Sequence, residues 1–420
     1  MQRLVVLTVF ALLSMALTAQ KARNEYRWGM AYLKAEQLSE AVSSLHKAAD
    51  KGNPDACVQL GVLYHQGHGV KQDDAEAVRL YRQAAAQGHA EGAYLLAEML
   101  RMGVGVEKNM AEALTFYTLA AKKGHADAQH ELAELYYKGG EVARNRTEAA
   151  YWYKQLAAKG DSAALFMLGG MSEFGDGMPL DSAQAFDYYR QAAAANHAEG
   201  ALSLAYCYDH GIGTKADEAT ALQWYEEAAR RGVAEAAYHL AKRSDRPAQQ
   251  LRWLKQAADS GYAQALNDLG TCYAHGEGIR RDAQKALECY RLAAEQRLPE
   301  AQFNLAVAYE QGQGTDADKT KALEYYSRAA VQNYGPAAYA LGRLYATGEA
   351  GEQNWQKAAT WFETAAKQGV PTAQYNMGIL YYRGQGVDKN LHEARKWLER
   401  AAATMSPIQE AARNFLESHF

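Results

Sequence analysis

The glycine pairs of this sequence are its first candidates for chemistry. Gly67-His68-Gly69 and several similar Gly-x-Gly pairs match pieces of the dinucleotide-binding fingerprint, whose glycines let the backbone approach a phosphate. None of the pairs follows a predicted strand or supplies the third glycine at the required spacing. They therefore give no support for a phosphate or nucleotide site.

Histidines that could bind a metal are the next candidates. Only His65 and His68 lie close together, and the further ligands of a zinc site are missing. His130-Glu131 begins like a zinc-protease motif, but the second histidine four residues after His130 is absent. No nucleophile elbow occurs either. The sequence therefore predicts no catalytic residue, no cofactor and no metal site, and we expect the protein not to be an enzyme.

The four cysteines leave two interpretations open. Cys272 and Cys289 are expected on the two helices of one hairpin, where a disulfide is conceivable, and an even number of cysteines is typical of exported chains. Cys207 and Cys272 occupy the same repeat position two repeats apart, which is expected to be too far for a direct bridge. The alternative is that all four are small, buried, apolar side chains.

A repeat of 36 residues positions all of these side chains. Its first full copy is 54–89. Each copy carries a leucine, replaced by Met377 in the last copy, followed by a small residue that we call the marker. Every interval between markers is 36 residues except one of 29, so ten copies run over 54–406. The markers are Gly61, Ala97, Ala133, Gly169, Ala205, Ala241, Gly270, Ala306, Gly342 and Gly378.

Each repeat reads as two antiparallel helices. In the first copy, Ala56, Leu60, Gly61 and Tyr64 form one stripe of a helix, and the small marker would let the second helix approach closely. The glycines of the loop can adopt positive φ at low cost, and a glycine near residue 88 would end the second helix.

An Asp or Asn precedes the second helix in nine repeats, which predicts a side-chain N-cap. In five of them a Glu or Gln follows three residues later, as in a capping box. The nine residues are Asp73, Asn109, Asn145, Asp181, Asp217, Asp282, Asp318, Asn354 and Asn390.

The ends of the chain differ from the repeats. Residues 1–19 resemble a secretory signal peptide, with Arg3 before an apolar run that is too short to favour a membrane span. Residues 20–53 read as an atypical capping pair and 407–420 as a C-terminal capping helix. No linker separates these parts, so we expect one continuous domain. The protein is therefore expected to be exported, either periplasmic or secreted, without a stable membrane span after signal removal.

The charge balance argues against a nucleic-acid partner. Without Arg3 the chain has 44 Lys and Arg against 49 Asp and Glu, a net charge of −5. Nucleic-acid binding proteins usually concentrate positive charge on one face.

The 29-residue repeat, 234–262, lacks the glycine loop and has Ser244-Asp245-Arg246-Pro247 instead. One expectation is a local change of superhelix curvature. The alternative is a docking patch for an acidic partner, since seven basic residues cluster there. They are Arg230, Arg231, Lys242, Arg243, Arg246, Arg252 and Lys255.

The repeat pattern, with its Leu60-Gly61 step, Gly67-x-Gly69 loop and Ala84-Ala85 pair, resembles the Sel-one-like repeat, a relative of the tetratricopeptide repeat. The resemblance covers 54–406, and 20–53 is closer to the tetratricopeptide form. It implies an all-α fold, a right-handed α/α superhelical solenoid of helix hairpins. It further implies a role as a scaffold or adaptor without catalytic residues.

An aromatic ladder is the one candidate binding surface. Two residues before most marker leucines stands an aromatic residue, and in tetratricopeptide relatives this face lines a concave groove. Neighbouring positions vary between copies, which is typical of a protein-binding surface. The alternative is that these rings only pack between adjacent first helices. The ladder residues are Tyr26, Tyr94, Phe166, Tyr238, Phe303, Tyr339 and Tyr375.

These observations lead to two hypotheses of function. The first is an exported, non-enzymatic scaffold that binds protein or peptide segments in the concave groove. The second is an envelope-associated factor that binds glycan or cell-wall material through the aromatic rings.

Overall fold

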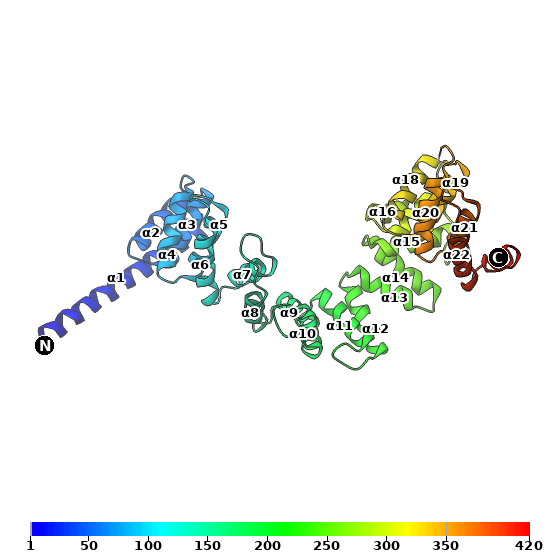
Figure 1. The fold of residues 1–420 in the computed structure, drawn as a ribbon. Helices are drawn as coiled ribbons and strands as arrows, with labels where there is room; N and C mark the ends of the chain where they lie inside the picture. The colour runs from blue at the N-terminus through cyan, green and yellow to red at the C-terminus, as the bar shows by residue number, and fades with distance from the viewer. Residues whose placement is uncertain (1, 350) are drawn as a thin grey trace. The chain divides into compact units, whose positions relative to one another are not determined.

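The computed structural model describes the backbone of residues 2–349 and 351–420, and side chains from residue 16 onward except at 350. All regular secondary structure in these residues is helical, and Figure 1 shows the helices in chain order. The predicted all-α solenoid of helix hairpins is confirmed. The helices are α1 (Gln2–Lys34), α2 (Leu38–Asp50), α3 (Pro54–Gln66), α4 (Asp74–Ala86), α5 (Ala90–Met102), α6 (Met110–Lys122), α7 (Ala126–Lys138), α8 (Arg146–Ala157), α9 (Ser162–Phe174), α10 (Ser182–Ala194), α11 (Ala198–His210), α12 (Glu218–Arg230), α13 (Ala234–Arg243), α14 (Pro247–Asp259), α15 (Ala263–His275), α16 (Ala283–Glu295), α17 (Pro299–Gln311), α18 (Lys319–Ala330), α19 (Gly335–Thr347), α20 (Trp355–Lys367), α21 (Pro371–Arg383), α22 (Leu391–Ala403) and α23 (Gln409–His419).

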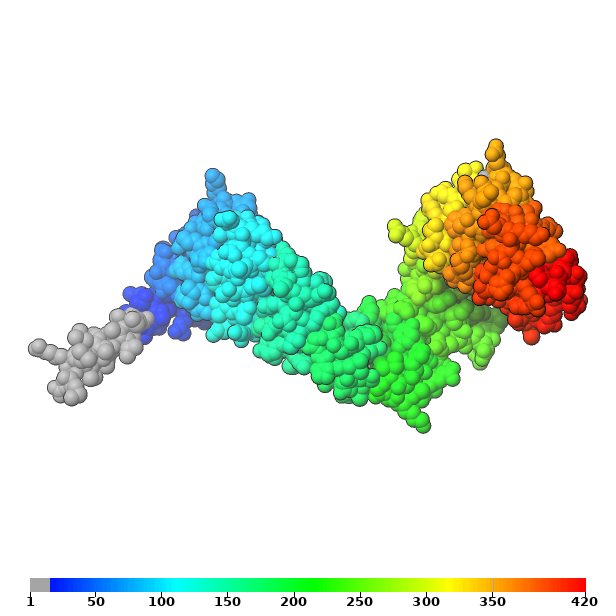
Figure 2. All heavy atoms as spheres, in the orientation of Figure 1, coloured from blue at the N-terminus to red at the C-terminus, as the bar shows by residue number. Residues whose placement is uncertain are grey.

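The chain divides into two compact units, with the boundary within α12. We call the part up to Ala221 the N-terminal half and the part from Leu222 the C-terminal half. From α1 to α11 and from α13 to α23, every helix packs on the next one along the chain, and the space-filling view shows consecutive repeats of each half lying against one another (Figure 2). The expectation of one continuous domain stays a prediction.

Close packing inside a hairpin depends on the marker residue. A Cβ atom built on Gly61 would lie 2.6 Å from the Tyr81 ring, and one on Gly169 would lie 2.4 Å from the Tyr189 ring. Such distances are too short for a real contact, so the ring fills the space that the missing side chain leaves. This confirms that the small marker allows the second helix to approach closely.

The predicted N-caps of the second helices are confirmed at all nine positions. At Asp181, the side-chain oxygen accepts a hydrogen bond from the Gln184 backbone N–H at 2.9 Å, and the other eight residues make the equivalent bond. Each such cap stabilises its helix by about 1 kcal/mol.

The capping-box prediction is only half right. In a capping box, the backbone N–H of the N-cap residue would donate to the Glu or Gln side chain three residues later. Here the N–H of Asp181 donates to the Ser172 carbonyl at 2.9 Å instead, and the N–H of Asp73 donates to the Tyr64 carbonyl at 3.0 Å. The Glu76 carboxylate instead accepts a hydrogen bond from the Arg79 guanidinium, with an N–O distance of 2.7 Å. The N-cap residue therefore joins the two helices of its hairpin, because its side chain caps one helix and its backbone binds the other.

The two ends of the chain have the expected helical character. The expected signal peptide, 1–19, falls on α1 and largely on residues whose side chains lie outside the described set, so it stays an expectation. At the other end, α23 packs on α22 and buries Ala412. Among the described residues, no helix combines the length and hydropathy that a membrane crossing needs.

Candidate functional site

The aromatic ladder of the N-terminal half consists of partly buried rings set between helices. Tyr94 stacks on His125 with ring centroids 4.6 Å apart, and Phe166 stacks on His197 at 4.7 Å. On another side, Tyr94 lies 6.1 Å from the buried ring of Tyr117. Each ring therefore occupies a slot between the second helix of its own repeat and the residue that precedes the next repeat. Burial, followed by the nearby charge of Glu98, raises the pKa of Tyr94 to about 12.

The same slot recurs in the C-terminal half. Phe303 lies 5.6 Å from Tyr326 of α18 and 5.6 Å from Tyr334, which precedes the next repeat. Tyr339 likewise lies 5.7 Å from Phe362. The agreement between the halves shows that the slot is a property of the repeat and does not depend on one local sequence.

Tyr238 and Tyr375 have additional partners. The Tyr238 hydroxyl donates to Asp268 at 3.1 Å, and its ring lies 5.3 Å from Tyr262. Tyr375 lies 6.4 Å from Phe415 of α23, so the C-terminal helix reaches this end of the ladder. In the described residues, no ring contact connects one ladder residue directly with the next one.

Buried tyrosines of the second helices hold carboxylates on the first helices. The Tyr189 hydroxyl donates to Glu173 at 2.7 Å; burial and then this bond raise the tyrosine pKa, so the phenol remains a donor at neutral pH. We call such contacts tyrosine–carboxylate pairs. The others are Tyr117 with Glu98, Tyr153 with Glu134 and Tyr326 with Glu310.

The charged positions that vary between repeats are held by ion pairs. Glu98 also pairs with Arg101 at 3.2 Å, Lys242 pairs with Asp268 at 3.3 Å, and Arg343 pairs with Glu310. Near Arg101, burial raises the pKa of Glu131. The ladder is therefore surrounded by fixed polar groups of different charge in different repeats.

Three histidines that the sequence analysis passed over hold the junctions between repeats. The Nδ1 atoms of His89, His125 and His197 accept the backbone N–H three residues later, at 3.0–3.3 Å, and thereby cap α5, α7 and α11. Asn53 and Asp161 cap α3 and α9 in the same way. The sequence could have predicted these N-caps, since the five residues occur at intervals of 36 immediately before the first helices.

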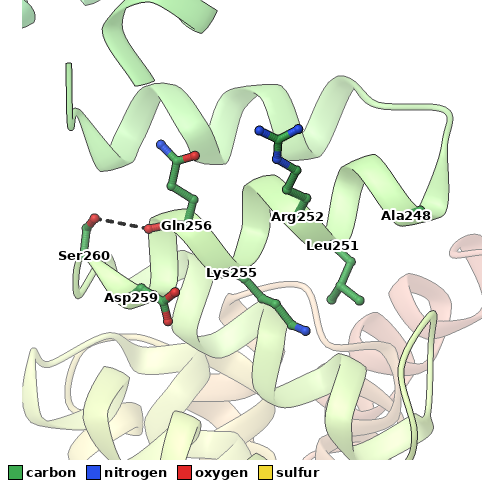
Figure 3. Close-up of a pocket in the computed structure, with 7 residues that line it drawn as sticks. All are labelled: Ala248, Leu251, Arg252, Lys255, Gln256, Asp259 and Ser260. Atoms are coloured by element: carbon green, nitrogen blue, oxygen red, sulfur yellow. Dashed lines mark hydrogen bonds between the residues drawn. The ribbon is translucent and has the colours of Figure 1, made fainter. Parts of the chain in front are cut away.

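The basic cluster of the short repeat is partly engaged in contacts within the protein. Arg230 and Arg231 both contact Glu227 at 2.8 Å, while Arg243 lies over the ring of Tyr225 at 5.2 Å. A shallow pocket on α14 contains Arg252 and Lys255, whose side chains leave the helix on different sides (Figure 3). Among the described residues, Arg246, Arg252 and Lys255 have no ion pair, so the acidic-partner alternative stays a prediction. The pocket is lined by Ala248, Leu251, Arg252, Lys255, Gln256, Asp259 and Ser260.

The cysteines and metal ligands can now be placed. All four cysteines are free thiols, with Cys57 and Cys207 buried and Cys272 and Cys289 partly buried. Within the described part of the chain, no group of three or more His, Cys, Asp or Glu side chains is arranged to hold a metal ion.

Comparison with protein families matches the Sel1 repeat in ten segments, which confirms the ten predicted copies. The match leaves out 234–250, the first part of the short repeat. The segments are 54–89, 90–125, 126–161, 162–197, 198–233, 251–262, 263–298, 299–334, 335–370 and 371–403. A search of curated proteins gave no match.

Two solved structures are similar over most of this chain. A protective antigen present in uropathogenic Escherichia coli strains, which displays an SLR fold, is 28% identical with a TM-score of 0.77 and covers 97% of this chain and 91% of its own. A Sel1 repeat protein from Oxalobacter formigenes is also 28% identical, with a TM-score of 0.54, and covers 73% of this chain and 89% of its own.

Proposed function

Because this chain belongs to the Sel1 repeat family, whose members are generally protein-interaction scaffolds, we propose that it binds a protein or peptide segment along the aromatic ladder. The observation that carries the proposal is the recurrence of one aromatic slot, seen at Tyr94, Phe166 and Phe303, among polar neighbours whose charge changes from repeat to repeat. Aromatic rings that are already fixed by contacts within the protein provide binding area at little entropic cost. Polar neighbours that differ between repeats provide specificity.

The contacts favour a protein partner over a glycan. In the N-terminal half, imidazole rings cover one face of Tyr94 and of Phe166, so those faces are unavailable for stacking on sugars. The partly exposed remainder of each ring still suits an apolar side chain of a partner. Neither the contacts nor the similar proteins support the glycan alternative.

The ladder proposal is tested by replacing two neighbouring rings with leucine. The double variant Phe303→Leu/Tyr339→Leu keeps apolar volume in the slots, so we expect it to lose less than about 1.5 kcal/mol of stability per site. We expect the dissociation constant for a protein captured from envelope extract to rise by more than about tenfold. Tyr151→Leu, at an exposed aromatic residue of α8 away from the ladder, is the control.

Two results would contradict this function. Binding that matches the parent protein, with stability also unchanged, would remove the ladder from the interface. Recovery of glycan alone from the extract would assign the surface to another class of ligand.

We also propose that the protein is exported, with the mature chain beginning at or near Gln20. Support comes from the basic residue and apolar run at 3–17, and from the similarity to a protective antigen. N-terminal sequencing of the native protein should find the new terminus near residue 20. The variant Leu12→Arg/Leu13→Arg, which interrupts the apolar run, should retain the full N-terminus. An intact Met1 in the unaltered native protein would refute cleavage.

A further inference from the structure

The short repeat leaves a cavity where other repeats have a contact. In complete repeats, the second loop glycine rests on the start of the preceding second helix: a Cβ on Gly213 would lie 1.9 Å from the Ser182 carbonyl oxygen, and one on Gly314 would lie 2.2 Å from Ala283. At Gly278, which follows the short repeat, a Cβ would meet nothing within 4 Å. The loop around Gly278 therefore stands away from the N-terminus of α14.

A cavity of about 230 Å³ lies between this loop and the short hairpin. Ala241 and Leu254 give it apolar walls, Gln250, Thr271 and Cys272 line it with neutral polar groups, and Lys242, Asp268 and Glu277 add charges. Sites for small molecules usually measure about 300–1,000 Å³, so this volume suits a single amino-acid side chain better than a cofactor.

The charges inside the cavity are unequally engaged. Asp268 accepts hydrogen bonds from Lys242 at 3.3 Å and from the ladder residue Tyr238 at 3.1 Å. Glu277 stands exposed at the cavity, and no ion pair involves it among the described residues. The Glu277 carboxylate therefore remains available for a cation, in a cavity whose Asp268 contacts the ladder residue Tyr238.

We propose that this cavity, lined by Lys242, Asp268, Cys272 and Glu277, binds one basic side chain of the partner segment, with arginine as the best match. The aliphatic part of the side chain would lie against Ala241 and Leu254, and the guanidinium would bind the Glu277 carboxylate in the two-pronged geometry of such pairs. This inference rests on the proposed function, because it specifies one residue of the segment that the ladder binds.

Cys272 provides a reporter inside the cavity. In the full-length Cys289→Ala protein, Cys57 and Cys207 are buried, which leaves Cys272 as the partly exposed thiol. We would measure its rate of modification by iodoacetamide, located by peptide mass spectrometry, while adding N-acetyl-argininamide. N-acetyl-citrullinamide, which has nearly the same shape without the charge, is the matched control probe.

The arginine probe should slow modification of Cys272 in a saturable way, and the citrulline probe should not. Glu277→Gln should raise the concentration for half protection by about tenfold, the effect of losing a charge-assisted hydrogen bond. Glu300→Gln, an exposed carboxylate that does not line the cavity, should leave protection unchanged.

Equal protection by both probes, or protection that survives Glu277→Gln, would overturn the assignment. That failure is distinguishable from failure of the ladder proposal. Partner capture that responds to Phe303→Leu/Tyr339→Leu would remain valid without the cavity, and arginine-specific protection would stand even if those ladder substitutions had no effect.

Discussion

Tyr189→Ala should destabilise the N-terminal half by about 3–5 kcal/mol, the usual cost of truncating a large buried aromatic side chain. The ring of Tyr189 fills the space over Gly169, lies 6.0 Å from Phe166 and is only 4% exposed. Alanine would leave a cavity between the two helices of the hairpin. The loss should be visible as a lower denaturation midpoint in urea, followed by circular dichroism.

Two further substitutions distinguish the contribution of the buried ring. One removes only the hydroxyl, and the other removes an exposed ring as a control. Tyr189→Phe keeps the ring but leaves Glu173 without its donor, so we expect a loss of about 1–2 kcal/mol. Tyr151→Ala, at a side chain that is 49% exposed, should change stability by less than about 0.5 kcal/mol. If Tyr189→Ala proved no more damaging than Tyr151→Ala, the hairpin core described here would be incorrect.

Gly213→Ala should cost about 2–5 kcal/mol, whereas Gly278→Ala should cost only about 1–2 kcal/mol. Both glycines have φ of +68°, so alanine suffers the same left-handed backbone penalty at each position. Only at Gly213 does the new methyl group also collide with a backbone carbonyl, that of Ser182. The difference between the two variants therefore measures the contact that the short repeat lacks.

The comparison is made in urea, with a local readout from hydrogen exchange of two helices: the one before each loop and the second helix of the preceding repeat. Greater exchange should be confined to α10 and α11 in Gly213→Ala. Equal losses in the two variants would show that the loop at Gly278 is as tightly packed as the others, and the cavity assignment would fall with it.

Most of the fold could be predicted because its determinants are local. The register of the markers, the glycine loops and the nine N-caps each depend on a few neighbouring residues, and the structure confirms all three. Asp181 illustrates this, since its side chain caps the adjacent helix through a bond to the Gln184 N–H, only three residues away.

The details of the candidate site depend on contacts between residues far apart in sequence, and these were not predictable. The tyrosine–carboxylate pairs connect residues 16 or 19 positions apart, and the stacking of His125 on Tyr94 joins the last residue of a repeat to its first helix. The reciprocal bond of the capping box was wrongly predicted for the same reason, because the N–H of Asp73 donates to the Tyr64 carbonyl of the other helix.

The histidine caps also determine the tautomer of their imidazole rings. Because Nδ1 of His125 accepts the Ala128 N–H at 3.3 Å, that nitrogen carries no hydrogen, and the hydrogen must be on Nε2, which lies 2.7 Å from Glu91. His89 has the same arrangement, with Gly92 on one nitrogen and Asp55 on the other. One ring thus binds its own helix through one nitrogen and the preceding repeat through the other. A flip of the ring would break both bonds together, so the order of one repeat is coupled to that of the next through a single side-chain torsion.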